Sequence, residues 1–135
     1  MSEQATTERH PDSAGAQLAD LSNELVQLHK RNCGKGPIAA RTHLSGDTLV
    51  CIMRGGLTQS EHTLRDTGHC ESVEGGRRLL HEAMREDMIA AAERATGRRV
   101  ISLMTATDCW EDLESAVFVL EPGAAAASRN GDGPA

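Results

Sequence analysis

Two segments with the pattern of β-hairpins, separated by a helical stretch, constrain the fold of this 135-residue chain more than any other feature. Residues 38–45 alternate between apolar and polar side chains, and a turn signal at Gly46 leads into the apolar run 49–54. A second pair of candidate strands covers residues 99–105 and 115–120. Each hairpin has an apolar face that another layer must cover.

Three helices are predicted around the hairpins. The first has four leucines at three- and four-residue steps, namely Leu18, Leu21, Leu25 and Leu28. This stripe suits packing on the protein's own sheet, and the alternative is a seam with a partner helix. Glycine at position 34 is a suitable C-terminal cap for this helix.

The second and third helices lie between the hairpins. The sequence Thr58-Gln59-Ser60-Glu61 has the form of a capping box, which predicts a short helix over residues 59–66. A longer helix is expected over residues 72–96, with Gly97 as its stop signal.

The predicted order of elements is α-β-β-α-α-β-β. The simplest way to bury these faces is an α+β fold with two layers, in which a four-stranded, mainly antiparallel sheet has its helices on one face. Residues 1–15 are polar and residues 122–135 are rich in alanine, glycine and proline, so we expect two disordered tails around a single domain at residues 16–121.

Composition excludes several classes of function. A net charge of -6 and 1% aromatic residues argue against a nucleic-acid binder, which needs a basic surface and often stacking rings. No apolar run is long enough to span a bilayer, so we expect no direct membrane insertion. No charged segment followed by an apolar core opens the sequence, and no secretory signal is expected.

The chain has four cysteines, at positions 33, 51, 70 and 109, and no two of them have C-x-x-C spacing. In a chain of this length with no export signal, they are expected to be reduced thiols in a cytoplasmic protein.

Three short motifs occur in a recognisable order: GKGP at residues 34–37, RGGLT at 54–58 and TGRRVIS at 96–102. In this order the chain resembles, over residues 18–121, the MpsC-type domain, a small soluble component named for a sodium-translocating, membrane-potential-generating system. The resemblance implies a cytoplasmic accessory protein that works beside a membrane-embedded ion-translocating subunit. It supplies no catalytic residues.

The connection between the last two predicted strands is acidic and contains the single tryptophan, Trp110. Its acidic residues are Asp108, Glu111, Asp112 and Glu114. The EF-hand spacing is absent. Tryptophan is enriched among the residues that dominate binding at interfaces, so Trp110 with Asp108, Glu111 and Asp112 is the candidate partner-binding loop. The alternative is a solvated loop whose tryptophan folds back on the core.

Gly34, Lys35 and Gly36 form a candidate anion site, because glycines let backbone N–H groups converge and the lysine adds a charge. The P-loop pattern is absent, and a helix stop followed by a turn is the simpler interpretation. Six arginines are spread among acidic residues: Arg41, Arg54, Arg77, Arg78, Arg98 and Arg99. They indicate mixed surface charge, with an anion-binding face as the alternative.

No metal site, cofactor or catalytic residue is predicted. His62, His69, Cys70 and His81 are the nearest approach to a metal-binding set, but their spacing does not enforce convergence and we expect scattered surface histidines. The adjacent pair His69 and Cys70 is a poor arrangement for a base and its nucleophile.

The leading functional hypothesis is therefore a non-enzymatic protein-interaction domain of the MpsC type, cytoplasmic and homodimeric. Its self-association surface would be the leucine-striped helix or the long helix. A regulatory module that binds a small anionic ligand is the alternative, and an enzyme of unknown type is third, because no acid–base or nucleophile arrangement is evident.

Overall fold

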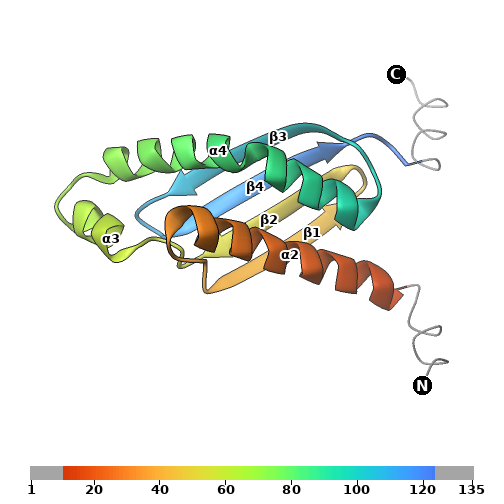
Figure 1. Cartoon of the computed structure of the whole chain (residues 1–135), viewed down its shortest axis with the longest axis horizontal. Coiled ribbons are helices and arrows are strands. Elements are labelled where there is room, and N and C mark those ends of the chain that lie inside the picture. Colours follow the sequence, from red (N-terminus) through yellow and green to blue (C-terminus); the bar gives the residue numbers. More distant parts are fainter. Residues whose placement is uncertain (1–10, 124–135) are drawn as a thin grey trace.

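The computed structural model describes residues 11–123, which form one sheet and three helices (Figure 1). In chain order the elements are helix α2 (Pro11–Cys33), strands β1 (Ala39–Ser45) and β2 (Thr48–Arg54), helices α3 (Gln59–Asp66) and α4 (Cys70–Thr96), and strands β3 (Val100–Asp108) and β4 (Leu113–Leu120). The predicted order α-β-β-α-α-β-β and the α+β class are confirmed.

All neighbouring strands of the four-stranded sheet are antiparallel, in the order β1-β2-β4-β3. The two hairpins meet where β2 pairs with β4, and Cys51 there lies opposite Ala116. The apolar run 49–54 is thus a central strand, and the edges belong to the more polar β1 and to β3.

Helices α2 and α4 lie side by side across one face of the sheet, as predicted (Figure 1). The covered face carries alternate residues of the central strands, all fully buried: Leu49, Cys51 and Met53 from β2, and Ala116, Phe118 and Leu120 from β4. Met84 and Met88 of α4 pack against them. The apolar core therefore lies between one layer of helices and one layer of strands.

The leucine stripe of the first helix packs on the protein's own sheet. Leu21, Leu25 and Leu28 are buried and belong to the core, while Leu18 is half-buried at its edge. This corrects one of the two self-association surfaces expected from the sequence, because a stripe used in this way is not free to form a seam with a partner helix.

Strand β1 is less buried than its alternating pattern predicts. Thr42 is buried and bonds to Ser22 of α2 (Oγ1–Oγ 2.7 Å), but Ile38 and Leu44 are exposed. As an edge strand, β1 is covered mainly by α2, and that helix covers only the middle of the strand.

The local end signals were largely predicted correctly. Thr58 and Glu61 form the capping box, and Gly34 and Gly97 take left-handed backbone angles after their helices. Helix α2, however, begins at Pro11, so residues 11–15, predicted as part of a tail, are helical. The other predicted tail segments, 1–10 and 124–135, lie outside the described residues.

Within residues 11–123, none of the helices combines the length and apolarity required to cross a bilayer.

Gly55 is a position where the fold requires glycine. Its φ is +71°, and a Cβ there would lie 2.5 Å from Cγ1 of Ile38. We expect Gly55→Ala to lower the free energy of unfolding by about 1–2 kcal/mol, chiefly through the left-handed backbone. Urea denaturation measures this change.

Gly75→Ala is the matched control, since Gly75 lies inside helix α4 and a Cβ added there would meet nothing within 4 Å. This change is expected to stabilise the protein by roughly 0.5–1 kcal/mol, because alanine is the better helix former. Equal changes in the free energy of unfolding for Gly55→Ala and Gly75→Ala would show that the fold does not require glycine at position 55.

Candidate functional site

The most unusual side chain of the molecule is Arg77 of helix α4, which has an exposed fraction of 0%. Its guanidinium donates to both carboxylate oxygens of Glu61 (2.5 and 2.8 Å), to Oε1 of Glu114 (3.0 Å) and to the carbonyl of Gly56 (2.8 Å). These acceptors come from helix α3, strand β4 and the connection after β2. One buried cation therefore joins four parts of the chain.

Its neighbours keep Arg77 charged in spite of burial. Burial alone would lower the pKa of this guanidinium, but the hydrogen bonds with Glu61 and the charge of Glu114 outweigh it and raise the pKa. A planar guanidinium suits such a position, because it offers several donors in a fixed arrangement.

Glu114 is the central acceptor on the strand side of this group. Its exposed fraction is 4%, and it also accepts hydrogen bonds from Nε2 of His81 (2.8 Å) and from the Thr107 hydroxyl (3.1 Å). Burial would raise the pKa of this carboxyl, but the bond from His81 and the charge of Arg77 lower it. Glu114 is thus an ionised core residue, although the sequence grouped it with the acidic loop.

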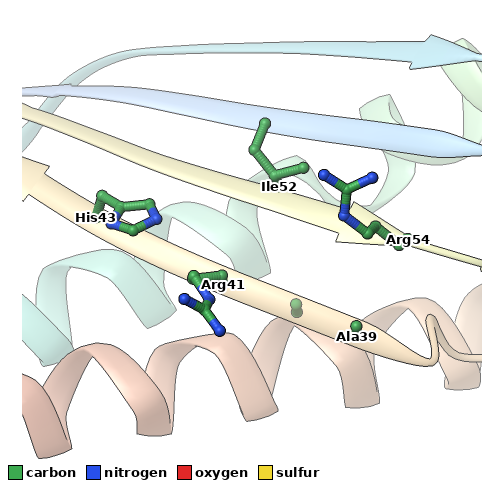
Figure 2. A pocket seen from close by; sticks show the side chains of 6 residues that line it. Ala39, Arg41, His43, Ile52 and Arg54 are labelled. Carbon is green, nitrogen blue, oxygen red and sulfur yellow. The ribbon is translucent and has the colours of Figure 1, made fainter.

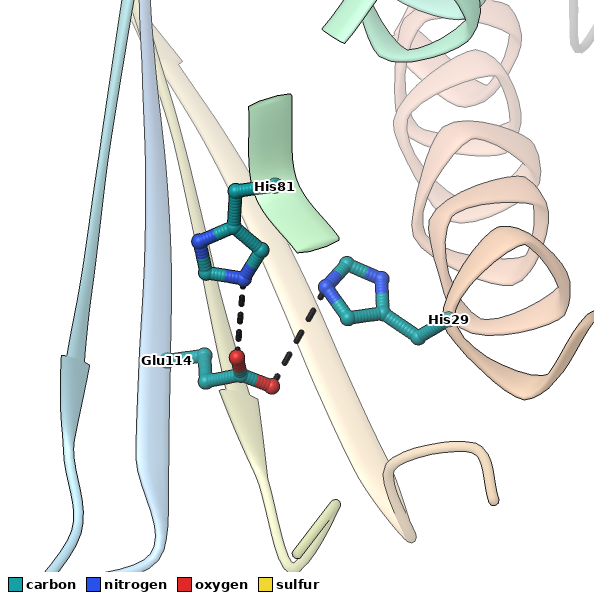
Figure 3. A group of neighbouring side chains, drawn as sticks. All are labelled: His29, His81 and Glu114. Atoms are coloured by element: carbon teal, nitrogen blue, oxygen red, sulfur yellow. Dashed lines mark hydrogen bonds and ion pairs between the residues drawn. The ribbon is translucent and has the colours of Figure 1, made fainter. Parts of the chain in front are cut away.

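Two histidines approach Glu114 from the helix layer (Figure 3). His81 extends from α4 and His29 from α2, and their ring centroids are 5.6 Å apart. Both side chains are buried, which corrects the prediction that His81 lies on the surface. His62 and His69 do not join them: the first contacts Asp112 and the second contacts Thr67.

The same group is the one set of metal-ligand side chains that converges within the described residues. One ligand atom each from His29, His81 and Glu114 lies within 4.8 Å of the others. Nδ1 of His29 lies 2.8 Å from the carbonyl of Leu25, and Nδ1 of His81 lies 3.0 Å from the hydroxyl of Thr105.

The periodicity of the sequence contained a signal for this cluster. Arg77 and His81 continue the buried stripe of Met84 and Met88 on α4 at helical spacing. His29 follows the buried Leu25 by one turn, and Glu114 precedes the inward-facing residues of β4 at two-residue spacing. Polar residues at core positions were the indication, but periodicity alone does not indicate which of them are in contact.

The predicted partner-binding loop, which we call the Trp110 loop (residues 108–112), connects β3 to β4. Trp110 is 64% exposed, so the alternative in which the ring folds back on the core is wrong. Asp108 and Glu111 are also exposed, and the backbone N–H of Glu111 donates to Asp108 (3.1 Å).

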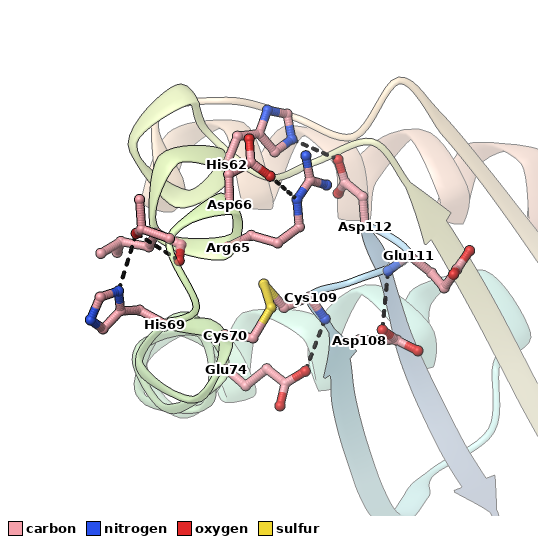
Figure 4. Close-up of a disulfide and its surroundings, with 12 residues drawn as sticks. His62, Arg65, Asp66, His69, Cys70, Glu74, Asp108, Cys109, Glu111 and Asp112 are labelled. Atoms are coloured by element: carbon pink, nitrogen blue, oxygen red, sulfur yellow. Dashed lines mark hydrogen bonds and ion pairs between the residues drawn. A yellow bond between two sulfur atoms is a disulfide. The ribbon is translucent and has the colours of Figure 1, made fainter.

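A disulfide holds this loop to helix α4 (Figure 4). Cys109 is joined to Cys70, with 5.6 Å between their Cα atoms, and the backbone N–H of Cys109 donates to Glu74 (2.9 Å). This corrects the expectation of four reduced thiols; Cys33 and Cys51 remain free. Residues 70 and 109 are far apart in sequence, and no spacing rule predicted that the fold brings them together.

Asp112 holds the other side of the loop. Its carboxylate accepts a hydrogen bond from the backbone N–H of Leu57 (3.0 Å) and lies 3.1 Å from Nε2 of His62 (Figure 4). Its backbone has φ of +53°, in the left-handed region that aspartate tolerates better than most residues. Of the residues predicted to bind a partner, Asp112 is therefore the one that positions the loop.

Lys35, the predicted anion-binding lysine, already has partners. Its ammonium donates to the carbonyl of Gly55 (2.6 Å) and lies 3.4 Å from that of Leu57. Gly34 and Gly36 flank it in the turn after α2, where Gly36 passes close to Val26. Two of the six arginines considered as an anion-binding face, Arg41 and Arg54, lie together at a different place, on the sheet.

Arg41 and Arg54 line a shallow hollow of about 410 Å³ on the uncovered face of β1 and β2, together with His43 and Ile52 (Figure 2). The hollow has no acidic side chain among its lining residues in the described part of the chain.

Comparison with known families agrees with the fold and the motifs. The family model described as "Na+-translocating membrane potential-generating system (MpsC)" matches residues 14–122, and the chain belongs to this family. No curated protein and no solved structure shows a significant match.

The buried charge network predicts a large difference between two adjacent arginines. Arg77→Ala leaves Glu61 and Glu114 without their shared cation, and we expect it to lower the free energy of unfolding by about 3–5 kcal/mol. The exposed neighbour Arg78→Ala is the control, with an expected change within about 0.5 kcal/mol. Denaturant unfolding at pH 7 measures both, and similar losses would contradict the network.

Glu61 makes the protein sensitive to acid. Burial would raise the pKa of its carboxyl, but hydrogen bonds from Arg77 and from the Thr58 backbone lower it below the usual value. Since the folded-state pKa is the lower one, the contribution of Glu61 is complete above its unfolded pKa of about 4.3 and is lost as the pH falls through the folded value.

The difference in unfolding free energy between wild type and Glu61→Gln is therefore expected to shrink between pH 6 and pH 3. Urea titrations across this range measure it, with the exposed Glu86→Gln as control. A difference that stays constant over the whole range would show that Glu61 does not carry this charge.

Proposed function

We propose that this member of the MpsC family is a non-enzymatic accessory domain that binds another protein of a sodium-translocating, membrane-potential-generating system through its Trp110 loop. The proposal rests on one observation above the others: the only tryptophan is exposed on a loop that the rest of the molecule holds in place. The family description supplies the kind of system, and the loop supplies the surface.

The loop is suited to binding because its order does not have to be acquired on association. The disulfide at Cys109 and the bonds of Asp112 fix both sides of the tryptophan. A loop held in this way loses little backbone freedom on binding, and large aromatic anchors dominate interface energetics. Exposing an indole ring without a partner is otherwise unfavourable.

The negative charges on either side of Trp110 indicate what kind of surface on a partner would fit the loop. Asp108 and Glu111 are exposed on either side of Trp110, so a complementary site has an apolar pocket with lysine or arginine at its rim. In our proposal this site belongs to a membrane-embedded ion-translocating subunit, on a part of it that reaches outside the bilayer.

The structure changes the arguments for two expectations from the sequence, the homodimer and the cytoplasmic location. The predicted homodimer can no longer use the leucine stripe. The long helix α4 stays the other surface expected from the sequence, and the uncovered sheet face, where Ile101 and Met104 are exposed, is a further proposed contact. The cytoplasmic location stays a prediction, and the Cys70–Cys109 disulfide removes the part of its argument that rested on reduced thiols.

A specific observation also favours a second function, the binding of a small anion. Arg41 and Arg54, two of the six arginines considered from the sequence as an anion-binding face, line one hollow together with His43. Because Lys35 already donates to backbone carbonyls, this hollow is a better place for a phosphate or carboxylate than the turn at residues 34–36.

Removal of the tryptophan tests the leading proposal. Tagged wild type and Trp110→Ala are recovered from membranes solubilised in mild detergent, and co-purified proteins are identified by mass spectrometry. We expect wild type to retain an integral-membrane ion-translocating subunit, and Trp110→Ala to weaken that association by about 2 kcal/mol, or roughly 30-fold.

Leu79→Ala is the matched control, since Leu79 is an equally exposed apolar residue (67%) on helix α4. Arg41→Ala distinguishes anion binding from partner binding, because it removes a cation from the hollow and leaves the Trp110 loop unchanged. Equal recovery of the subunit by wild type and Trp110→Ala would refute the loop as the binding surface.

A further inference from the structure

We propose that His29, His81 and Glu114 form a binding site for a divalent transition-metal ion of the Zn²⁺ class. Two imidazole nitrogens and one carboxylate oxygen are a common ligand set for zinc, and with three protein ligands a fourth position is left for water or another ligand. The proposal is independent of the partner of the Trp110 loop.

His29 provides the strongest single argument. Its ring is completely buried, its Nδ1 faces the carbonyl of Leu25, and a carbonyl can only accept, so Nδ1 carries the proton. The unprotonated Nε2 is then directed to Glu114, 4.0 Å from Oε1, and has no hydrogen-bond partner within the described residues (Figure 3). A buried lone pair in this position is costly unless something binds it.

The surroundings of the three ligands have the form found around bound metals, where the ligand groups are themselves held by hydrogen bonds. The other nitrogen of His29 is bonded to Leu25, and that of His81 to the Thr105 hydroxyl. Glu114 accepts from Arg77 and Thr107. Each ligand is therefore oriented by a neighbour that does not itself have to bind the ion.

Binding requires the three ligand atoms to move relative to one another. Tetrahedral ligands with bonds of about 2.1 Å lie about 3.4 Å from one another. The nearest oxygens of Glu114 lie 2.8 Å from His81 Nε2 (Oε2) and 4.0 Å from His29 Nε2 (Oε1), and the three ligand atoms, one from each residue, lie within 4.8 Å of one another. An ion bound to one carboxylate oxygen would draw the two histidine rings toward it.

Binding requires a change of tautomer at His81. Its Nε2 now donates to Glu114, and metal coordination needs a lone pair on that atom. The proton moves from Nε2 to Nδ1, and the Thr105 hydroxyl then accepts from Nδ1 where it previously donated. The neutral ring keeps one proton throughout, so this step releases none.

Charge and access also favour a cation here. Glu61 and Glu114 carry two negative charges against the single positive charge of Arg77, which leaves a surplus negative charge in a buried region. Of the three ligands, His81 also lines a cavity of about 250 Å³ between α4 and β3, together with Thr105 and Thr107, so open space reaches one side of the site.

Titration of the chelator-treated full chain with Zn²⁺ tests the site, with stoichiometry and affinity measured by calorimetry. We expect one ion per chain with a dissociation constant below about 1 µM, and a loss of at least tenfold in His29→Leu. Thr105→Val keeps all three ligands but removes the bond that orients His81, and should weaken binding by roughly 10-fold or more. The exposed His43→Leu and the free thiol Cys33→Ser are controls that should bind as wild type does.

A measurement on wild type needs no substitution and decides the case should His29→Leu fail to fold. Long-range ¹H–¹⁵N spectra of the histidine rings should show the Nε2 resonances of His29 and His81 shifting on addition of Zn²⁺, with His43 and His62 unchanged. Absence of stoichiometric uptake, shifts confined to other histidines, or thiolate-to-metal absorption with Co²⁺ would each overturn the proposal. In that outcome the cluster is a structural charge network only.

Discussion

Arg77 is the residue on which the organisation of this protein depends. A guanidinium removed from water is tolerated only when carboxylates and carbonyls replace its hydration, and here they come from α3, β4 and the segment after β2. Glu61 has two tasks in this arrangement, because it caps helix α3 and also binds Arg77. The position of the short helix is thereby tied to the core, although none of its own residues is fully buried.

The network divides the layer between helices and sheet into two regions. Toward the end of β4 at Leu120, the layer is apolar, with Phe118, Met84 and Met88 at its centre. Toward Glu114, it is ionic, and the Trp110 loop ends two residues before Glu114 in the chain. The disulfide and the contacts of Asp112 lie at the same end. The proposed metal site and the proposed binding loop therefore share one end of the molecule, while remaining separate in their contacts.

Local signals in the sequence were sufficient for the elements and for most of their ends, although not for the start of helix α2. The capping box at Thr58, the left-handed glycines at positions 34 and 97, and the hairpin turn at Gly46 each act over a few residues, and each was predicted correctly. Apart from that helix start, the predictions that were wrong concern residues far apart in the chain. Cys70 pairs with Cys109, and His81 meets Glu114, because packing of α4 on β3 and β4 brings them together.

The sequence by itself thus determined the order of helices and strands, the class of fold and the family motifs, since hydrophobic periodicity and turn chemistry are local properties of the chain. Only the tertiary structure decided which polar residues are inside. His29, Arg77 and Glu114 occupy core positions of their elements by periodicity, but whether such residues are paired, and with which partners, depends on how three separate elements pack. The exposure of Trp110 was decided in the same way, because the disulfide and Asp112 hold both sides of its loop against the rest of the fold and leave the indole ring outside.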